Sequence, residues 1–229
     1  MLFLGIVQIG LPYGLVFWAE QYVSSGLAAV LFATMPFFVV VFAHFMVDER
    51  LTKLKAIGMA ASFIGLVVIF WRDMLVSQGF VGNTYLYGGL AVVGSAISGA
   101  LASVVAKQYA EKVDPAANVL VQSFTGAVAL MVVGFATRES TLFNFTIVSI
   151  LAILYLGVVG SALAFVGMYW LLTKTTATKV SLITFITPIT ALILGWVVLQ
   201  EIPDPSLGLG AVLILAGIYL TIKPTGRYL

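Results

Sequence analysis

The sequence predicts an all-α fold, a polytopic transmembrane bundle of eight helices. The chain of 229 residues is 62% hydrophobic and only 9% charged, with a mean hydropathy of +1.14. A soluble domain is nearer half apolar and a quarter charged, so most of this chain's exterior must face lipid. Apolar runs such as 211–216 lack the alternation with polar residues that strands of a membrane barrel would show.

Eight apolar segments are long enough to cross a bilayer, whose hydrocarbon core of about 30 Å requires roughly 20 helical residues. Short polar turns separate them, for example 48–50, 72–73, 111–115 and 203–205. Helices satisfy their own backbone hydrogen bonds inside lipid, so each segment is expected to be helical. In chain order, the predicted spans are 1–18, 25–46, 54–71, 85–107, 116–136, 147–172, 180–199 and 207–222.

The positive residues of the connecting loops predict the orientation in the membrane. Lys and Arg gather on the cytoplasmic side of membrane proteins. One side of the predicted bundle carries only Arg72 and Arg138, whereas the other carries Arg50, Lys53, Lys55, Lys107, Lys112, Lys174, Lys179, Lys223 and Arg227. This asymmetry places both termini in the cytoplasm.

The chain repeats itself after 152 residues without a gap. This shift superposes Trp18 on Trp170, Pro36 on Pro188, Glu49 on Glu201, Gly58 on Gly210 and Gly65 on Gly217. A long internal period dictates the architecture. Because the shift spans five helices, an odd number, the two copies must cross the membrane in opposite directions. Inverted repeats of this kind are a recurrent plan of secondary transporters.

The two repeats are expected to cover residues 1–73 and 84–229. The second holds five helices and the first only three, so the chain reads as a ten-helix plan without its first two helices. We interpret this difference as a fragment or a late start, and a genuine eight-helix protein is the alternative.

The ordered motifs of both copies resemble the EamA-type domains of the drug/metabolite transporter superfamily. The first copy contains Trp18-Ala-Glu-Gln-Tyr22, Ser25-Gly-Leu-Ala-Ala29, Pro36, Glu49-Arg-Leu51, Gly58 and Gly65; the second contains Tyr169-Trp170, Pro188, Glu201, Gly210 and Gly217. The resemblance implies two five-helix inverted repeats in the inner or plasma membrane. It also implies efflux or exchange of small organic solutes, including amino acids and drugs.

Two prolines mark candidate breaks in the membrane. Pro36 and Pro188 occupy equivalent positions, and each frees the carbonyl four residues earlier, on Phe32 and Thr184. We interpret them as hinges or as part of the cavity lining, although a static kink is the alternative. Thr184 and Thr187 stand on one helical face beside Pro188; their hydroxyls either bind solute or bond to carbonyls of their own helix.

Four other residues are candidate cavity lining, each with a plainer alternative. Gln122 must face the bundle interior, where a bond to another helix is favoured over a bond to solute. Trp18 and Trp170 either wall a solute path or belong to an aromatic belt at the headgroups. Glu20 either binds a cationic group or a proton, or is an ordinary loop acid. For Glu49 and Glu201, capping and ordering of the next helix is favoured over a role in transport.

The small residues of the fourth span, residues 94, 95, 98, 99 and 103, predict a close helix crossing, either between two protomers or, as we favour, within the chain. Cys is absent, and no His/Cys cluster or Gly-rich phosphate loop occurs. These features argue against an enzyme and predict no cofactor and no metal, and the scattered basic residues argue against nucleic acid as a partner.

The function predicted is therefore a secondary-active transporter, an exporter of small organic solutes that works by alternating access. Its expected partners are a small-molecule solute and the lipid bilayer, and a homodimer is left open. The alternative is a non-transporting membrane subunit, or an incomplete fragment, that needs another chain to supply the missing helices.

Overall fold

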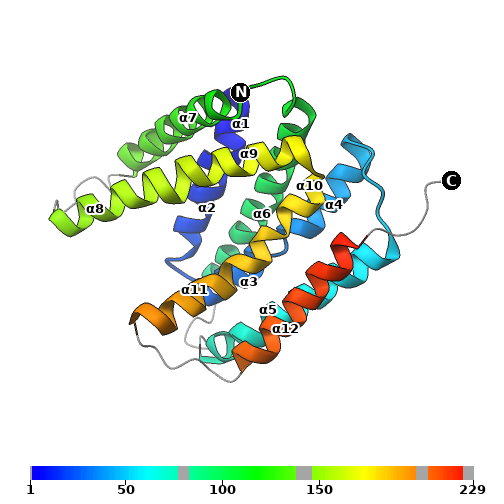
Figure 1. Cartoon of the computed structure of the whole chain (residues 1–229). Helices are drawn as coiled ribbons and strands as arrows, with labels where there is room; N and C mark the ends of the chain where they lie inside the picture. The colour runs from blue at the N-terminus through cyan, green and yellow to red at the C-terminus, as the bar shows by residue number, and fades with distance from the viewer. Residues whose placement is uncertain (1, 77–82, 138–145, 200–205, 224–229) are drawn as a thin grey trace.

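The computed structural model describes residues 2–76, 83–137, 146–199 and 206–223, and over these residues it forms eight helical passes (Figure 1). Several passes contain more than one element, and those labelled η are π-helical. In chain order the elements are α1 (Leu2–Gly5), η1 (Ile6–Gly10), α2 (Leu11–Ala19), α3 (Ser25–Phe32), α4 (Met35–Met46), α5 (Lys53–Val76), α6 (Asn83–Tyr109), α7 (Pro115–Ala136), α8 (Ile147–Tyr155), η4 (Leu156–Leu163), α9 (Ala164–Lys174), α10 (Ala177–Ser181), α11 (Ile183–Leu199) and α12 (Ser206–Ile222).

The fold class predicted from composition is confirmed. Six of the described helices are long and apolar enough to cross a membrane, and two shorter apolar helices cover Ala177–Thr187 and Gly208–Ile222. Large apolar side chains on their outer faces are exposed, including Phe124 at 68%, Phe135 at 71% and Ile147 at 78%. These side chains can face outward because exposing an apolar side chain to lipid, unlike exposing it to water, costs no free energy.

Four passes are interrupted where the sequence predicted continuous helices. The first and sixth contain the π segments η1 and η4, and the shift of 152 places η4 over residues 4–11, around η1. The second breaks between Phe32 and Met35, and the seventh breaks at Leu182. Pro36 lies in the first turn of α4. A backbone N–H at that position would have no hydrogen-bond partner within the helix, so the N–H that proline lacks is not missed.

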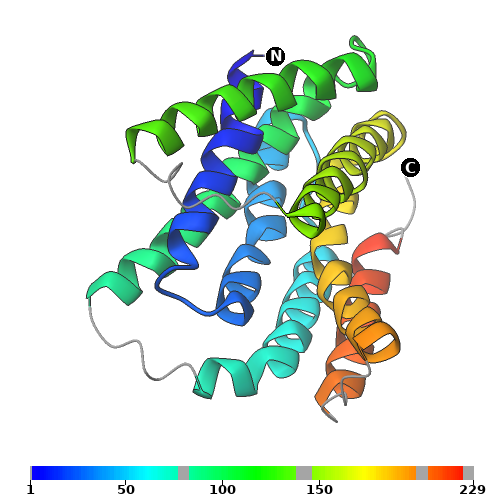
Figure 2. The same ribbon diagram turned by 90° about the vertical axis from the view of Figure 1, so that its left-hand side faces the viewer.

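Helix α6 is the centre of the bundle. It packs against η1, α2, α3, α4, α9 and α10, and Figure 2 shows α1 and α2 lying beside it. The Ser95 hydroxyl donates to the Pro12 carbonyl oxygen at 3.1 Å, and the Ser98 hydroxyl to the Val7 carbonyl oxygen at 2.6 Å. The predicted close crossing by small residues is therefore confirmed, and it joins α6 to the first pass.

Helices α5 and α12 cross through the glycines that revealed the repeat. A Cβ on Gly58 would lie 2.5 Å from the Gly217 carbonyl oxygen, and a Cβ on Gly65 would lie 2.6 Å from the Gly210 carbonyl oxygen. The shift of 152 residues maps Gly58 onto Gly210 and Gly65 onto Gly217. Exchanging the two copies therefore turns the contact between Gly58 and Gly217 into the contact between Gly210 and Gly65, and the reverse. A half-turn about one axis generates such self-complementary contacts.

The centre of that crossing is a pair of repeat-equivalent residues. The Ser62 hydroxyl donates to the Ile214 carbonyl oxygen at 3.0 Å, and the two residues are 152 positions apart. Figure 1 shows α5 and α12 running in opposite directions, and α4 and α11 likewise. Both observations fit two copies related by a pseudo-twofold axis that passes near Ser62.

Candidate functional site

A cavity of about 770 Å³ lies between the first, second, fourth, sixth and seventh passes. Its volume is in the range of small-molecule sites. Its wall is mainly apolar and aromatic, and it comprises Gln8, Pro12, Tyr13, Val16, Phe17, Glu20, Ser25, Ala28, Ala29, Phe32, Met35, Ser95, Gly99, Ser103, Gly160, Leu163, Ala164, Phe165, Gly167, Met168, Leu171, Ala177, Val180, Ser181, Ile183 and Thr184.

Most of this wall consists of residues related by the internal repeat. Eight pairs separated by 152 positions line it together: Gln8 and Gly160, Pro12 and Ala164, Tyr13 and Phe165, Val16 and Met168, Ser25 and Ala177, Ala28 and Val180, Ala29 and Ser181, Phe32 and Thr184. The first and second passes thus face their own repeat partners, the sixth and seventh, across the cavity. Helix α6 supplies a further wall through Ser95, Gly99 and Ser103.

Both π-helical segments contribute to this wall at matching positions. Gln8 lies in η1 and Gly160, its repeat partner, lies in η4. π-Helical turns widen the helix locally and are frequent at functional sites. At this pair of positions one copy presents an amide side chain to the cavity and the other presents only backbone, so the two matching positions differ in chemistry.

The cavity is exposed at one end and closed at the other. At the first end Phe17, Glu20 and Ser25 are exposed. At the other end Ser103 and Ala177 are buried, with 4% and 1% of their surfaces accessible. The wall formed by η4 and α9 is also exposed, at Gly160, Leu163 and Gly167. We call the two ends the Glu20 end and the Glu49 end.

Hydrogen bonds to Glu49 hold the helices together at the closed end of the cavity. Asp48 adopts a left-handed backbone (φ 55°), and the Glu49 amide donates to the Ala43 carbonyl oxygen at 3.1 Å, which turns the chain back over α4. The Glu49 carboxylate accepts the Ala177 amide at 2.6 Å, the Thr178 amide at 3.2 Å and the Thr178 hydroxyl at 2.7 Å. An anion is stabilised at a helix N-terminus, here that of α10.

The prediction that Glu49 caps the next helix is therefore wrong. Its carboxylate binds a helix that begins 128 residues later, in the other predicted repeat, because the reversed turn at Asp48 carries the side chain away from α5. Glu201, the repeat partner of Glu49, lies outside the described residues.

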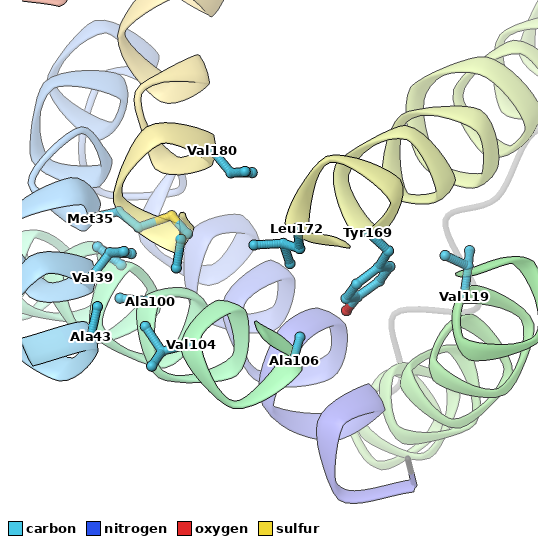
Figure 3. Packing of buried hydrophobic residues seen from close by; sticks show 12 residues of the cluster. Met35, Val39, Ala43, Ala100, Val104, Ala106, Val119, Tyr169, Leu172 and Val180 are labelled. Atoms are coloured by element: carbon cyan, nitrogen blue, oxygen red, sulfur yellow. The ribbon is translucent and has the colours of Figure 1, made fainter. Parts of the chain in front are cut away.

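Further polar contacts join the helices at the Glu49 end. The Lys107 ammonium donates to the Leu172 carbonyl oxygen at 2.6 Å, which links α6 to α9. The Gln108 amide donates to the Met46 carbonyl oxygen at 2.9 Å, which links α6 to α4. Figure 3 shows the apolar layer at this end, in which Leu172 and Val180 lie near side chains of α4 and α6.

Two consecutive buried hydrogen bonds between side chains connect α9 to α7. The Tyr169 hydroxyl donates to the Gln122 side-chain oxygen at 2.5 Å, and the Gln122 amide nitrogen donates to the Asn118 side-chain oxygen at 2.8 Å. Gln122 is only 1% exposed. The expectation that it faces the interior and bonds to another helix is confirmed.

Of the seven predicted site residues whose side chains the structure describes, two lie on the cavity wall, Glu20 and Thr184. Pro36 is buried at the start of α4, and Gln122 is engaged with Tyr169. Thr187 is exposed and donates to the Ile183 carbonyl oxygen at 3.0 Å.

The predicted tryptophans lie outside the cavity wall. Trp18 is 42% exposed, with its ring 5.1 Å from that of Tyr22, and Trp170 is 53% exposed beside the loop at 110–115. The backbone of Pro188 lies in α11, and its side chain is outside the described part of the chain.

Sequence reasoning missed most of the wall, notably Tyr13, Phe165 and Ser103. The signal that could have found the paired positions is the repeat itself, applied to every residue of the first and second spans rather than to its conspicuous tryptophan and prolines.

Comparison with known proteins agrees with this architecture. The chain matches the EamA-like transporter family over residues 1–71 and 86–223. It is 32% identical over 213 residues to the uncharacterized transporter YoaV of Bacillus subtilis, covering 93% of this chain and 72% of that protein. It is 30% identical over 215 residues to the uncharacterized transporter YvbV of the same organism, covering 94% and 68%.

More distant similarity extends the comparison. The chain is 26% identical over 211 residues to a WAT1-related chloroplastic protein of Arabidopsis thaliana, covering 90% of this chain and 50% of that protein. A solved crystal structure superposes with a TM-score of 0.72 at 19% identity, covering 95% of this chain and 75% of that chain, which shows a shared fold. The chain belongs to the EamA-like transporter family, and it is therefore a membrane transporter and not an enzyme.

Proposed function

We propose that the protein is a secondary-active exporter of small organic solutes that works by alternating access between two inverted repeats, residues 1–73 and 84–229. The observation that carries this proposal is the cavity wall made of eight repeat-equivalent pairs. Two similar modules of opposite orientation can exchange shapes, so that a site on their shared axis is exposed first to one side and then to the other.

In this proposal the structure corresponds to one of the two states. The Glu20 end is exposed, and the Glu49 end is closed by the contacts of Glu49, Lys107 and Gln108. Transport would require Glu49 to leave the N-terminus of α10 while the Glu20 end closes. The positive charges of the loops support a cytoplasmic location for the Glu49 end and both termini, and with that orientation the state would be outward-open.

The role proposed for each candidate residue follows from its position relative to the cavity wall and the helix breaks. Thr184 and Glu20 would contact solute directly, since both line the cavity. Pro36 and Pro188 would act as hinges, because each lies within a few residues of a helix break in the second or seventh pass. Thr187, Gln122, Trp18 and Trp170 would surround the solute path without forming its wall in this state.

The solutes proposed are amino acids, metabolites or drugs with a substantial apolar part. Tyr13, Phe17, Phe32 and Phe165 all line the cavity, so an apolar body would be stabilised by contact with their rings. Export is the direction that the sequence resemblance implies.

Counterflow into proteoliposomes tests this function. Vesicles containing the protein and loaded with an unlabelled solute should accumulate the same solute in labelled form, from a panel of amino acids and aromatic compounds. Ala29→Phe fills the cavity and should lower the rate at least tenfold. Ala127→Phe adds the same group to an exposed position of α7 and should retain the parent rate. Parent-like counterflow by Ala29→Phe, or no counterflow of any solute in the panel, would contradict the proposal.

A further inference from the structure

Helices α5 and α12 lie side by side, and exchanging the two repeats turns their contacts into one another (Figure 1). A Cβ on Gly58 would meet the side chain of Thr221, and a Cβ on Gly210 would meet the side chain of Ile69. The shift of 152 residues maps Gly58 onto Gly210 and Ile69 onto Thr221. The exchange therefore converts the first contact into the second, and both are present in this structure.

The centre of the crossing obeys the same rule. A Cβ on Gly65 would lie 2.9 Å from the backbone nitrogen of Ile214, and a Cβ on Gly217 would lie 2.6 Å from the backbone nitrogen of Ser62. These two contacts are images of each other under the shift. The hydrogen bond between Ser62 and Ile214 joins repeat-equivalent residues, so the exchange maps this pair of residues onto itself.

The apolar cluster around the crossing shares this symmetry and reaches both helix breaks. It contains three buried pairs separated by 152 positions: Val30 and Leu182, Ala33 and Phe185, Leu66 and Ile218. Ala33 lies in the break between α3 and α4, and Leu182 forms the break between α10 and α11. The second and seventh passes are thus packed against the α5–α12 crossing at the points where they are interrupted.

Contacts at the Glu49 end lack this symmetry. Ala177, whose amide binds Glu49, is 1% exposed, whereas its repeat partner Ser25 is exposed. Tyr169 is 2% exposed, whereas its repeat partner Phe17 is 59% exposed. Ala177 and Tyr169 both belong to the apolar layer of the closed end. Exchanging the repeats would therefore map this closed layer onto residues that are open in this state.

This difference separates contacts that can persist during transport from contacts that cannot. In a transporter built from inverted repeats, the second state arises when each repeat takes the conformation of the other. A contact whose image is already present is kept by this change, because the exchange returns the same set of contacts. A contact whose image is absent must break. Close packing through glycines further favours a rigid crossing, since the two backbones meet without flexible side chains between them.

We propose that the α5–α12 crossing is a fixed hub that keeps its contacts in both states, while α4 and α10 separate by turning about the breaks at Ala33 and Leu182. This inference rests on the proposed transport function and specifies which contacts carry the movement. The hub comprises the residues at which the two helices meet: Gly58, Ser62, Gly65, Gly210, Ile214 and Gly217.

Distances between spin labels on the full chain in lipid nanodiscs test the hub without requiring a solute. Ile57→Cys and Leu209→Cys place one label on each hub helix, at exposed repeat-equivalent positions. His44→Cys and Lys179→Cys place a second pair on α4 and α10, where both residues are exposed. Each pair joins the first repeat to the second. Adding Glu49→Gln, which weakens the contact with α10, should populate longer distances in the second pair and leave the hub pair unchanged.

A shift of the hub distances in Glu49→Gln, or second-pair distances that do not lengthen, would overturn the inference. The labels replace exposed side chains, so neither pair disturbs the packing that it reports. Counterflow by the labelled protein, together with a shift of the hub pair, would show that the protein transports and that the hub assignment alone is wrong. An unchanged hub pair, a lengthened second pair and no counterflow of any solute would support the hub and contradict the transport function.

Discussion

Substitution of Glu49 by glutamine is expected to loosen the closed end of the cavity. The carboxylate accepts three hydrogen bonds from Ala177 and Thr178 at the N-terminus of α10. Glutamine keeps one carbonyl acceptor but loses the charge. Hydrogen bonds to a charged group contribute about 1.5–3 kcal/mol, against roughly 0.5–1.5 kcal/mol for neutral ones. For a half-buried residue, the closed state should lose about 1.4 kcal/mol, which shifts the equilibrium about tenfold toward opening.

The natural absence of cysteine allows this shift to be measured directly. Val180 lines the cavity near its closed end and is 7% exposed, so Val180→Cys reports access from that end. The rate of reaction with a membrane-impermeant maleimide is measured in inverted membrane vesicles, which expose the predicted cytoplasmic face. Adding Glu49→Gln to Val180→Cys should raise the labelling rate about tenfold, in proportion to the open population.

A matched substitution separates gating from a general effect of charge. Glu111→Gln removes an exposed carboxylate at the same end and should leave the labelling rate unchanged. If Glu49→Gln labels at the rate of its parent, the Glu49 contact does not hold this end closed. Equal acceleration by Glu111→Gln would likewise refute the reasoning, because the effect would then follow from charge alone.

Two further predictions concern the framework around the cavity. Gly210→Ala places a Cβ 2.6 Å from the Gly65 carbonyl oxygen and should destabilise the protein by about 1–3 kcal/mol in thermal unfolding in detergent; Gly208→Ala, in the same helix with nothing within 4 Å of its added Cβ, should not. Tyr169→Phe leaves the buried Gln122 oxygen without its donor and should cost about 1–3 kcal/mol by the same measurement; unchanged unfolding would show that this bond contributes nothing.

The helical passes were predictable because their signal, a long apolar segment, is local in the sequence. The repeat was predictable because its two copies align at one constant shift. Apolar length alone located each helix, and the recurrence of tryptophan, proline and glycine revealed the shift of 152 residues. The contacts explain why the glycines recur. Gly58 and Gly65 must meet Gly217 and Gly210 at a distance that any side chain would prevent.

Features that depend on distant partners were not predictable. The π segments and the breaks near Ala33 and Leu182 change the backbone hydrogen-bond register without changing the apolar pattern. The partner of Glu49 is 128 residues away, so its neighbours in sequence suggested the wrong helix. Likewise, Ser103 reads as one small residue among several until packing shows that its hydroxyl has no partner in the described chain.

Reciprocal motion of the two ends is measurable as a pair of distances between spin labels. One pair, at His44 and Lys179, reports the Glu49 end, and the other, at Gln21 and Ile193, reports the Glu20 end; all four side chains are exposed. Addition of a transported solute should populate longer distances in the first pair and shorter distances in the second. Changes in the same direction at both ends, or unchanged distances while the solute is exchanged, would contradict alternating access between the two repeats.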